Sequence, residues 1–149
     1  MTQSQKNLSR ATISAEGISV AHGDKKTLDV PSIEVLPNEV LVIIGPNGSG
    51  KTTLVLCLAL LMKPDKGSIA FRGEVVTDSR QTLRIRRRTA VVFQEALLLN
   101  SSVWNNVTMG LKFRGVKKEE AKVRAQHWLE RFGVSHFAQR QAKTLSGGQ

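Results

Sequence analysis

A glycine-rich loop between two apolar segments constrains this chain more than any other stretch. Residues 41–44 are apolar, residues 45–52 read Gly-Pro-Asn-Gly-Ser-Gly-Lys-Thr, and a nearly unbroken apolar run follows over residues 54–62. The spacing G-x-x-x-x-G-K-[ST] between a strand and a helix is typical of a loop that binds nucleotide phosphates. We therefore expect a buried strand over residues 40–44 and a helix that begins at the loop.

The residue types in this loop match the chemistry of phosphate binding. Gly48 and Gly50 can adopt backbone angles that turn main-chain N–H groups inward, and the start of the helix adds unpaired amides and a positive dipole end. The Lys51 ammonium is expected to reach the β- and γ-phosphates, and the Thr52 hydroxyl to ligate Mg²⁺. The loop is therefore interpreted as a nucleotide phosphate site.

Composition limits the class of protein but does not choose a partner. The chain has 149 residues, of which 40% are hydrophobic and 23% are charged, which is typical of one globular domain. Residues 1–10 are polar and are expected to be a loose terminus without a signal-peptide core, which favours a cytoplasmic protein. The single cysteine, Cys57, is expected to be a buried packing residue that forms no disulfide within the chain. The net charge of +10 fits nucleic acid, an anionic membrane surface or a polyphosphate ligand.

The residues ahead of the loop predict an antiparallel β layer. β-Branched and small residues predict a strand over residues 13–20, and residues 22–25 form a turn. One or two short edge strands are expected over residues 27–35, which include Pro31. A second turn at residues 37–39 leads into the strand that precedes the loop.

After the loop helix, a second set of strands is expected. Residues 63–67 should stop the helix, a short strand should follow over residues 68–71, and residues 75–76 should return beside it. The arginine-rich residues 79–88 could contact RNA or DNA, but a solvated helix end is the preferred interpretation, because no aromatic residue interleaves the charges. Residues 89–93 are predicted to be a second buried strand, parallel to the first.

Gln94 directly follows this second strand. Ligands of open parallel sheets bind beyond the carboxyl ends of the strands, so Gln94 is expected near the phosphate loop, where its amide could ligate Mg²⁺ or orient a water. The alternative is an ordinary surface loop residue.

The remainder of the chain is predicted to be helical. Ser101 or Ser102 should cap a helix over residues 103–111, and a longer helix is expected over residues 117–132, ended by Gly133. The apolar stripe of the longer helix is expected to comprise Ala121, Ala125, Trp128, Leu129 and Phe132. Trp104 and Trp128 are interpreted as packing residues rather than as platforms for a nucleobase.

The last five residues carry a family resemblance. They are Leu145, Ser146, Gly147, Gly148 and Gln149, and they match the signature sequence of the ABC transporter ATPases. With the phosphate loop and Gln94, the chain resembles an ABC ATP-binding subunit from about residue 11 to its last residue. The resemblance implies an α/β fold with a P-loop NTPase core, an antiparallel β layer and a partial helical subdomain. The implied organisation is a loose terminus at 1–10, a nucleotide-binding core at 11–93 and a helical subdomain at 94–149.

The resemblance also implies the site and its cofactors, ATP and Mg²⁺. Gln94 would be the glutamine that senses Mg²⁺ and touches the membrane partner, while His22 aligns with the aromatic residue that stacks on adenine. The signature residues 145–149 would contact the γ-phosphate bound to the other subunit of a head-to-tail dimer. The expected nucleotide-binding loop comprises Gly45, Pro46, Asn47, Gly48, Ser49, Gly50, Lys51, Thr52 and Thr53.

Implied partners are a second ATP-binding subunit, transmembrane permease subunits docked on residues 94–115, and a solute-binding protein, but no specific nucleic acid. The chain would then lie on the inner face of the cell membrane. Residues 92–99 and 110–115 resemble those of bacterial importers, with tungstate, molybdate or phosphate as the first expectation for the solute.

Two departures from the family pattern shape the expectations. His22 stands where the family commonly has tyrosine, and an imidazole stacks on adenine less well. In the family, an aspartate–glutamate pair and a switch histidine follow the signature, and neither has a counterpart in residues 1–149. Much of the family's parallel sheet likewise lies after the signature. We therefore expect this chain alone to bind nucleotide without turning it over at a family-like rate. The alternatives are a nucleic-acid-associated or other soluble ABC-type ATPase, or a truncated gene product without function.

Overall fold

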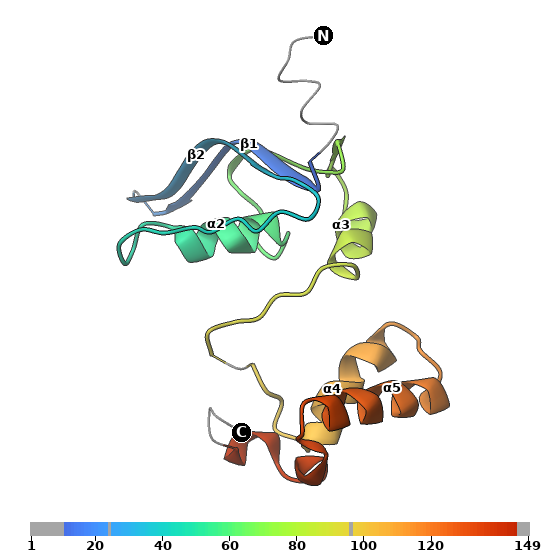
Figure 1. Cartoon of the computed structure of the whole chain (residues 1–149). Helices are drawn as coiled ribbons and strands as arrows, with labels where there is room; N and C mark the ends of the chain where they lie inside the picture. The colour runs from blue at the N-terminus through green and yellow to red at the C-terminus, as the bar shows by residue number, and fades with distance from the viewer. Residues whose placement is uncertain (1–10, 24, 96, 146–149) are drawn as a thin grey trace. The chain divides into compact units, whose positions relative to one another are not determined.

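The structure is a computed structural model that describes residues 11–23, 25–95 and 97–145. It divides into two compact units at residues 91 and 92, which are called here the sheet unit and the helical unit and are described separately (Figure 1). The elements of the sheet unit are β1 (Ile13–His22), β2 (Lys25–Val35), α2 (Lys51–Leu58), β3 (Lys66–Phe71), β4 (Glu74–Val75) and α3 (Ser79–Arg86). Those of the helical unit are α4 (Val103–Phe113), α5 (Lys118–Arg131) and two short 3₁₀ helices, Ser135–Phe137 and Ala142–Thr144.

The four strands form one antiparallel sheet in the order β2-β1-β3-β4. Ile13 of β1 lies opposite Val35 of β2 on one side and Phe71 of β3 on the other. The expected antiparallel layer is thus confirmed, and residues 25–35 form one continuous edge strand in which Pro31 is accommodated.

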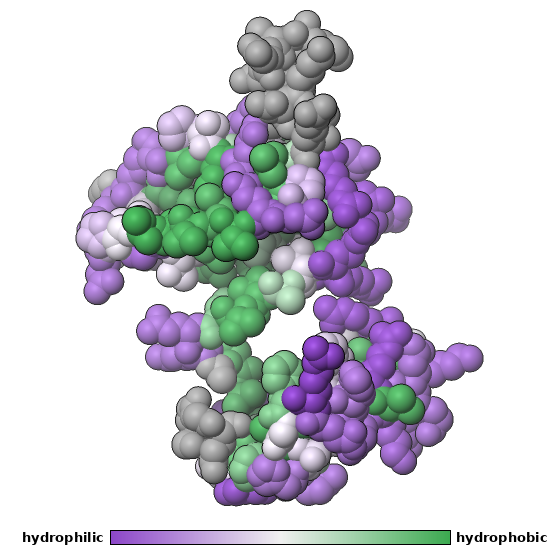
Figure 2. All heavy atoms as spheres, in the orientation of Figure 1, coloured by the Kyte–Doolittle hydropathy of each residue, from purple (hydrophilic) through white to green (hydrophobic). Residues whose placement is uncertain are grey.

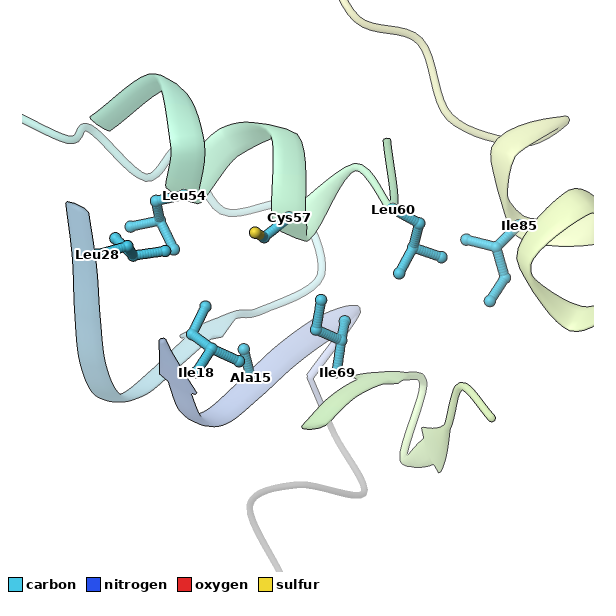
Figure 3. Packing of buried hydrophobic residues seen from close by; sticks show 8 residues of the cluster. All are labelled: Ala15, Ile18, Leu28, Leu54, Cys57, Leu60, Ile69 and Ile85. Atoms are coloured by element: carbon cyan, nitrogen blue, oxygen red, sulfur yellow. The ribbon is translucent and has the colours of Figure 1, made fainter. Parts of the chain in front are cut away.

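The core of the sheet unit lies between the sheet and α2. Leu54 and Cys57 of α2 face the strand residues Ile18 and Leu28, and all four are buried (Figure 3). Burial of one such aliphatic side chain stabilises a fold by about 1.5–3 kcal/mol, so this cluster fixes the phosphate-loop helix onto the sheet.

Helix α2 ends earlier than the sequence predicts. Leu60 has a left-handed backbone (φ 58°), and its N–H donates to the Cys57 carbonyl while the Leu61 N–H donates to the Leu56 carbonyl. This is the Schellman arrangement, which glycine usually completes, and here the buried Leu60 side chain offsets the steric cost of a β-carbon. The Nε of Arg86 in α3 donates to the Leu60 carbonyl at 2.7 Å and secures this turn. The prediction that residues 63–67 stop the helix was therefore wrong.

The expected arginine-rich helix is confirmed as α3. The Asp78 side chain caps it by accepting a hydrogen bond from the Gln81 N–H at 2.7 Å, and Ile85 anchors it in the core. Ahead of it, Arg72 and Gly73 both have positive φ and join β3 to β4 in a tight two-residue turn.

The two predicted parallel strands are absent from the described part of the chain. Residues 40–44 and 89–93 pair with no other segment there, and Val40 and Val92 are 88% and 96% exposed. Of residues 40–44, Ile43 is partly buried against the core cluster, and the others are exposed. The sheet unit accordingly shows apolar side chains on its surface (Figure 2). A strand exists through hydrogen bonds to a neighbouring strand, and the described residues supply no neighbour for either segment. The prediction of a parallel pair was wrong for this structure.

The helical unit contains α4 and α5 packed against each other. Ser102 caps α4 by accepting a hydrogen bond from the Asn105 N–H at 3.2 Å, as predicted. On α5, Ala121, Ala125 and Leu129 are buried, which confirms part of the predicted stripe.

The aromatic residues of the stripe behave differently. Phe132 is 74% exposed and Trp128 is 48% exposed. Their rings stack on each other with centroids 6.0 Å apart instead of entering a core. Trp128 and Phe132, predicted to belong to the apolar stripe, are thus not buried with its other members, whereas Trp104 on α4 is partly buried.

Candidate nucleotide-binding site

The phosphate loop connects residue 44 to α2, and two of its glycines have left-handed backbones. Gly48 has φ 80° and Gly50 has φ 87°, a region that residues with a β-carbon seldom adopt. At Gly50 a β-carbon would also lie 2.5 Å from the Thr27 carbonyl oxygen of β2. The loop is therefore held directly against the β1–β2 hairpin, and a side chain at position 50 would force them apart.

Lys51 is the first residue of α2, and its side chain turns back over the loop. Its ammonium donates hydrogen bonds to the Gly45 carbonyl at 3.0 Å and the Pro46 carbonyl at 2.7 Å. A positive charge is thereby held at the mouth of the loop, where phosphate oxygens can replace the two carbonyls as acceptors.

The start of α2 is open to an anion. Gly50 occupies the capping position without a side chain, and the first turn contains no acidic residue. The first helical hydrogen bond runs from the Leu54 N–H to the Gly50 carbonyl at 2.8 Å, so the amides of residues 51–53 precede the helical ladder. Unpaired amides and the helix dipole together favour a phosphate at this end.

The hydroxyl groups that follow Lys51 differ in exposure. Thr52 is exposed and Thr53 is partly buried. Among residues 11–23, 25–95 and 97–145, no cluster of three or more His, Cys, Asp or Glu side chains could hold a metal. A threonine hydroxyl next to a phosphate site still fits Mg²⁺, which is commonly held by few protein groups together with substrate phosphates.

The other loop residues expected to bind nucleotide, Pro46, Asn47 and Ser49, are exposed. His22 is the last residue of β1, is exposed, and lies opposite Lys25 of β2. The structure thus places residues 45–53 and the β1–β2 hairpin in one unit, joined through the contact of Gly50 with Thr27. This contact was not foreseen in the sequence, because nothing in the pattern of either segment pairs them.

Gln94 and Leu145 belong to the helical unit. Gln94 is exposed near its start. Leu145 is partly buried directly after the second 3₁₀ helix, and Ser146, Gly147, Gly148 and Gln149 lie outside the described residues.

The helical unit also carries a groove of about 750 Å³ that the sequence analysis did not identify. Its apolar floor includes Trp104 of α4 and Ala121 of α5, and the lysines Lys112, Lys118 and Lys122 line it. The available signal was the spacing of four residues, one helical turn, between Trp104, Thr108 and Lys112 and again between Lys118, Lys122 and Gln126.

Comparisons with known proteins assign the chain to one family. A family model described as "ABC transporter" matches residues 28–149. The chain is 38% identical over 131 residues to the methionine import ATP-binding protein MetN of Bordetella pertussis, covering 86% of this chain and 36% of the relative. It is 38% identical to the molybdate/tungstate import ATP-binding protein WtpC of Thermococcus kodakarensis, covering 90% of this chain and 40% of that protein.

Solved structures share the fold. The ATP-binding cassette MJ0796, in a dimeric post-hydrolysis state bound to ADP and Pi, matches with a TM-score of 0.80 and 26% identity, over 92% of this chain and 64% of that chain. CbiO1 of Clostridium perfringens, part of the ABC transporter complex cbiONQ, matches with a TM-score of 0.76 and 26% identity, over 94% of this chain and 57% of that chain.

The chain spans between about a third and two thirds of the length of these matched proteins. In the part of the chain that the structure describes, no helix is both long and apolar enough to cross a membrane. The family model covers residues 28–149 and therefore includes the phosphate loop, α2 and the whole helical unit. This chain accordingly belongs to the ABC transporter family.

Proposed function

We propose that this chain binds Mg·ATP at residues 45–53 and is the nucleotide-binding part of the ATPase subunit of an ABC importer. The observation that supports this most directly is the Lys51 ammonium, held by two loop carbonyls beside the uncapped first turn of α2. A triphosphate would accept hydrogen bonds from this ammonium and from the loop amides, which together offset its negative charge.

The Mg²⁺ ion would neutralise charge on the transferring phosphate when it is bound. The Thr52 hydroxyl is proposed as one ligand and the Gln94 side-chain oxygen as a second, since a hydroxyl and an amide oxygen are both hard oxygen donors. Gln94 would also position the attacking water. His22, exposed at the end of β1, is proposed to stack on adenine through its imidazole ring.

The proposed partners follow from family membership and from the relatives. MJ0796 is dimeric in its post-hydrolysis state. A head-to-tail dimer of this chain would bring the signature residues 145–149 to the nucleotide of the partner subunit. Light scattering with saturating Mg·ATP tests this dimer, and a chain that remains monomeric would contradict it.

The helical unit is proposed to dock on transmembrane permease subunits through residues 94–115. Leu97 is 76% exposed, and its neighbours Leu98 and Leu99 are exposed as well. Part of this segment also lines the groove between α4 and α5 through Trp104, so apolar surface is available to a partner. Docking there would hold the subunit on the inner face of the cell membrane.

Import with a solute-binding protein is the proposed direction of transport, since the relatives include import proteins for methionine, molybdate or tungstate, and phosphate. An inorganic oxyanion remains the solute that we propose, in agreement with two of these three relatives.

Binding of a fluorescent ATP analogue in the presence of Mg²⁺ tests the proposed function. Lys51→Ala removes the charge that opposes the phosphates, so the dissociation constant should rise about tenfold or more. Lys63→Ala is the matched control, because it removes an exposed lysine from the same unit outside the loop. Equal affinity of the wild type and Lys51→Ala would contradict nucleotide binding at this loop.

A further inference from the structure

A small pocket lies between the β3–β4 hairpin and α3 in the sheet unit. Its volume is about 210 Å³, and its lining residues are Phe71, Arg72, Glu74, Arg84, Ile85 and Arg88. Three guanidinium groups and one carboxylate give these walls a net charge of +2. The phosphate loop contributes no residue to this pocket.

Arg72 holds an unusual backbone conformation at the rim. It occupies the first position of the tight turn with φ 51°, where glycine, asparagine or aspartate is the ordinary choice. Its guanidinium lies over the Phe71 ring, 5.6 Å from the ring centroid, which limits the directions that it can take. The hydrogen bond from the Arg72 N–H to the Thr12 carbonyl at 3.1 Å holds this turn and keeps the guanidinium at the rim of the pocket.

Helix α3 supplies the opposite wall. Ile85 is buried in the core and fixes the helix. Arg84 lies in the last turn of α3, and Arg88 follows two residues after the helix ends; both line the pocket. Arg84 forms a salt bridge with Glu74 at 3.6 Å, so the single carboxylate is already paired. In the described ranges, neither Arg72 nor Arg88 forms a salt bridge, and both guanidinium groups remain available to an anion.

We propose that this pocket binds the phosphate-monoester group of a small phosphorylated molecule. Two guanidinium groups match the bidentate geometry of phosphate oxygens, and the dianion carries the charge that offsets the walls. The pocket is smaller than the cavities of about 300–1,000 Å³ that enclose whole ligands, so it has room for a phosphoryl group with a short stem but cannot enclose a whole nucleotide. Placement of cations at a helix C-terminus accounts for arginines on α3 but not for Arg72 on the hairpin.

The phosphate monoester could come from a free metabolite or from an anionic lipid headgroup. Glycerol 3-phosphate in solution and vesicles that contain phosphatidic acid present the same chemical group, so the two probes separate these sources. Both are measured in the Lys51→Ala background, which weakens the other phosphate site of the chain.

The pocket variant combines Arg72→Asn with Arg88→Ala. Asparagine tolerates the left-handed turn and removes only the guanidinium, so the hairpin is preserved. The control variant, Arg80→Ala with Arg87→Ala, removes the same charge from arginines of the same segment that do not line the pocket.

The expected result is saturable binding of glycerol 3-phosphate that weakens about tenfold or more in the pocket variant and changes less than about twofold in the control. Retention on phosphatidic acid vesicles relative to phosphatidylcholine vesicles, lost in the pocket variant, would identify a lipid as the source. Absence of binding to both probes, or equal weakening by both variants, would overturn the proposal.

Discussion

At position 67, the backbone of the neighbouring strand leaves no room for any residue other than glycine. Gly67 is the second residue of β3 and has φ 84°, and a β-carbon there would lie 2.5 Å from the Gly17 carbonyl oxygen of β1. Gly17 also has a positive φ of 57°, but a β-carbon on it would meet no atom within 4 Å. Comparing alanine substitutions at these two glycines therefore distinguishes the free-energy cost of a left-handed backbone from the cost of a steric clash between strands.

We predict that Gly67→Ala destabilises the sheet unit by about 2 kcal/mol or more, since β1 and β3 must separate locally to admit the methyl group. Gly17→Ala, the matched control, should lose only about 1 kcal/mol through backbone strain. Exposure of the Cys57 thiol during urea unfolding measures the sheet unit alone. An equal decrease in the free energy of unfolding in the two variants would show that β1 and β3 can move apart without a free-energy cost.

Individual residues of the loop were predicted from the sequence far better than their surroundings. The pattern from Gly45 to Thr52 specifies a local turn, and local turns follow from local residue types. Arg72 and Leu60 were not foreseen, because both occupy positions where glycine is usual and depend on contacts far along the chain. A pattern cannot report such contacts.

At the scale of elements, the antiparallel strands and α3, α4 and α5 were predictable, since each follows from its own periodicity and caps. Residues 40–44 and 89–93 were not. Their apolar side chains indicate that these segments favour a buried environment. A strand also requires a neighbouring strand for its hydrogen bonds, and the described residues do not provide one. The stripe of α5 failed at Phe132 for a related reason, since periodicity gives a face of the helix but not how far the facing surface extends.

We predict that Leu129→Ala destabilises the helical unit by about 2–5 kcal/mol, because Leu129 is buried and the change leaves a cavity. Phe132→Ala on the same helix should cost less than about 1 kcal/mol, because its side chain is mostly exposed. Both tryptophans lie in the helical unit, so the urea midpoint of tryptophan fluorescence isolates its unfolding. A larger decrease in the free energy of unfolding for Phe132→Ala than for Leu129→Ala would show that the Phe132 ring is buried.

At the scale of the whole molecule, Cys57 links stability to pH. Its side chain is 0% exposed, and burial, with a smaller effect of the Asp65 carboxylate, raises the pKa of the thiol above its ordinary value of 9.0. The unfolded chain therefore loses the thiol proton at lower pH than the folded chain does. The stabilising effect is complete below pH 9.0 and is lost as the pH rises through the folded value.

We predict that the free energy of unfolding of the wild type falls more steeply than that of Cys57→Ala above pH 9.0. The difference can reach about 1.4 kcal/mol for each pH unit between the unfolded and folded pKa values. Urea unfolding of both proteins between pH 7 and pH 10.5 measures this difference. The contributions of all other titrating groups cancel when the curve of the alanine variant is subtracted from that of the wild type. Parallel curves for the two proteins would contradict the raised pKa.

The hydrogen bonds of Lys51 to the Gly45 and Pro46 carbonyls bear on the release of a ligand as well as on its binding. A phosphate that binds as proposed would have to displace two acceptors that already satisfy the ammonium, so its net affinity would be a difference between two hydrogen-bonded states. On departure, the same carbonyls stand ready to recapture the ammonium. At the proposed site, the loop carbonyls would therefore compete with a bound nucleotide for Lys51 and shorten the time for which the hydrolysed nucleotide is retained.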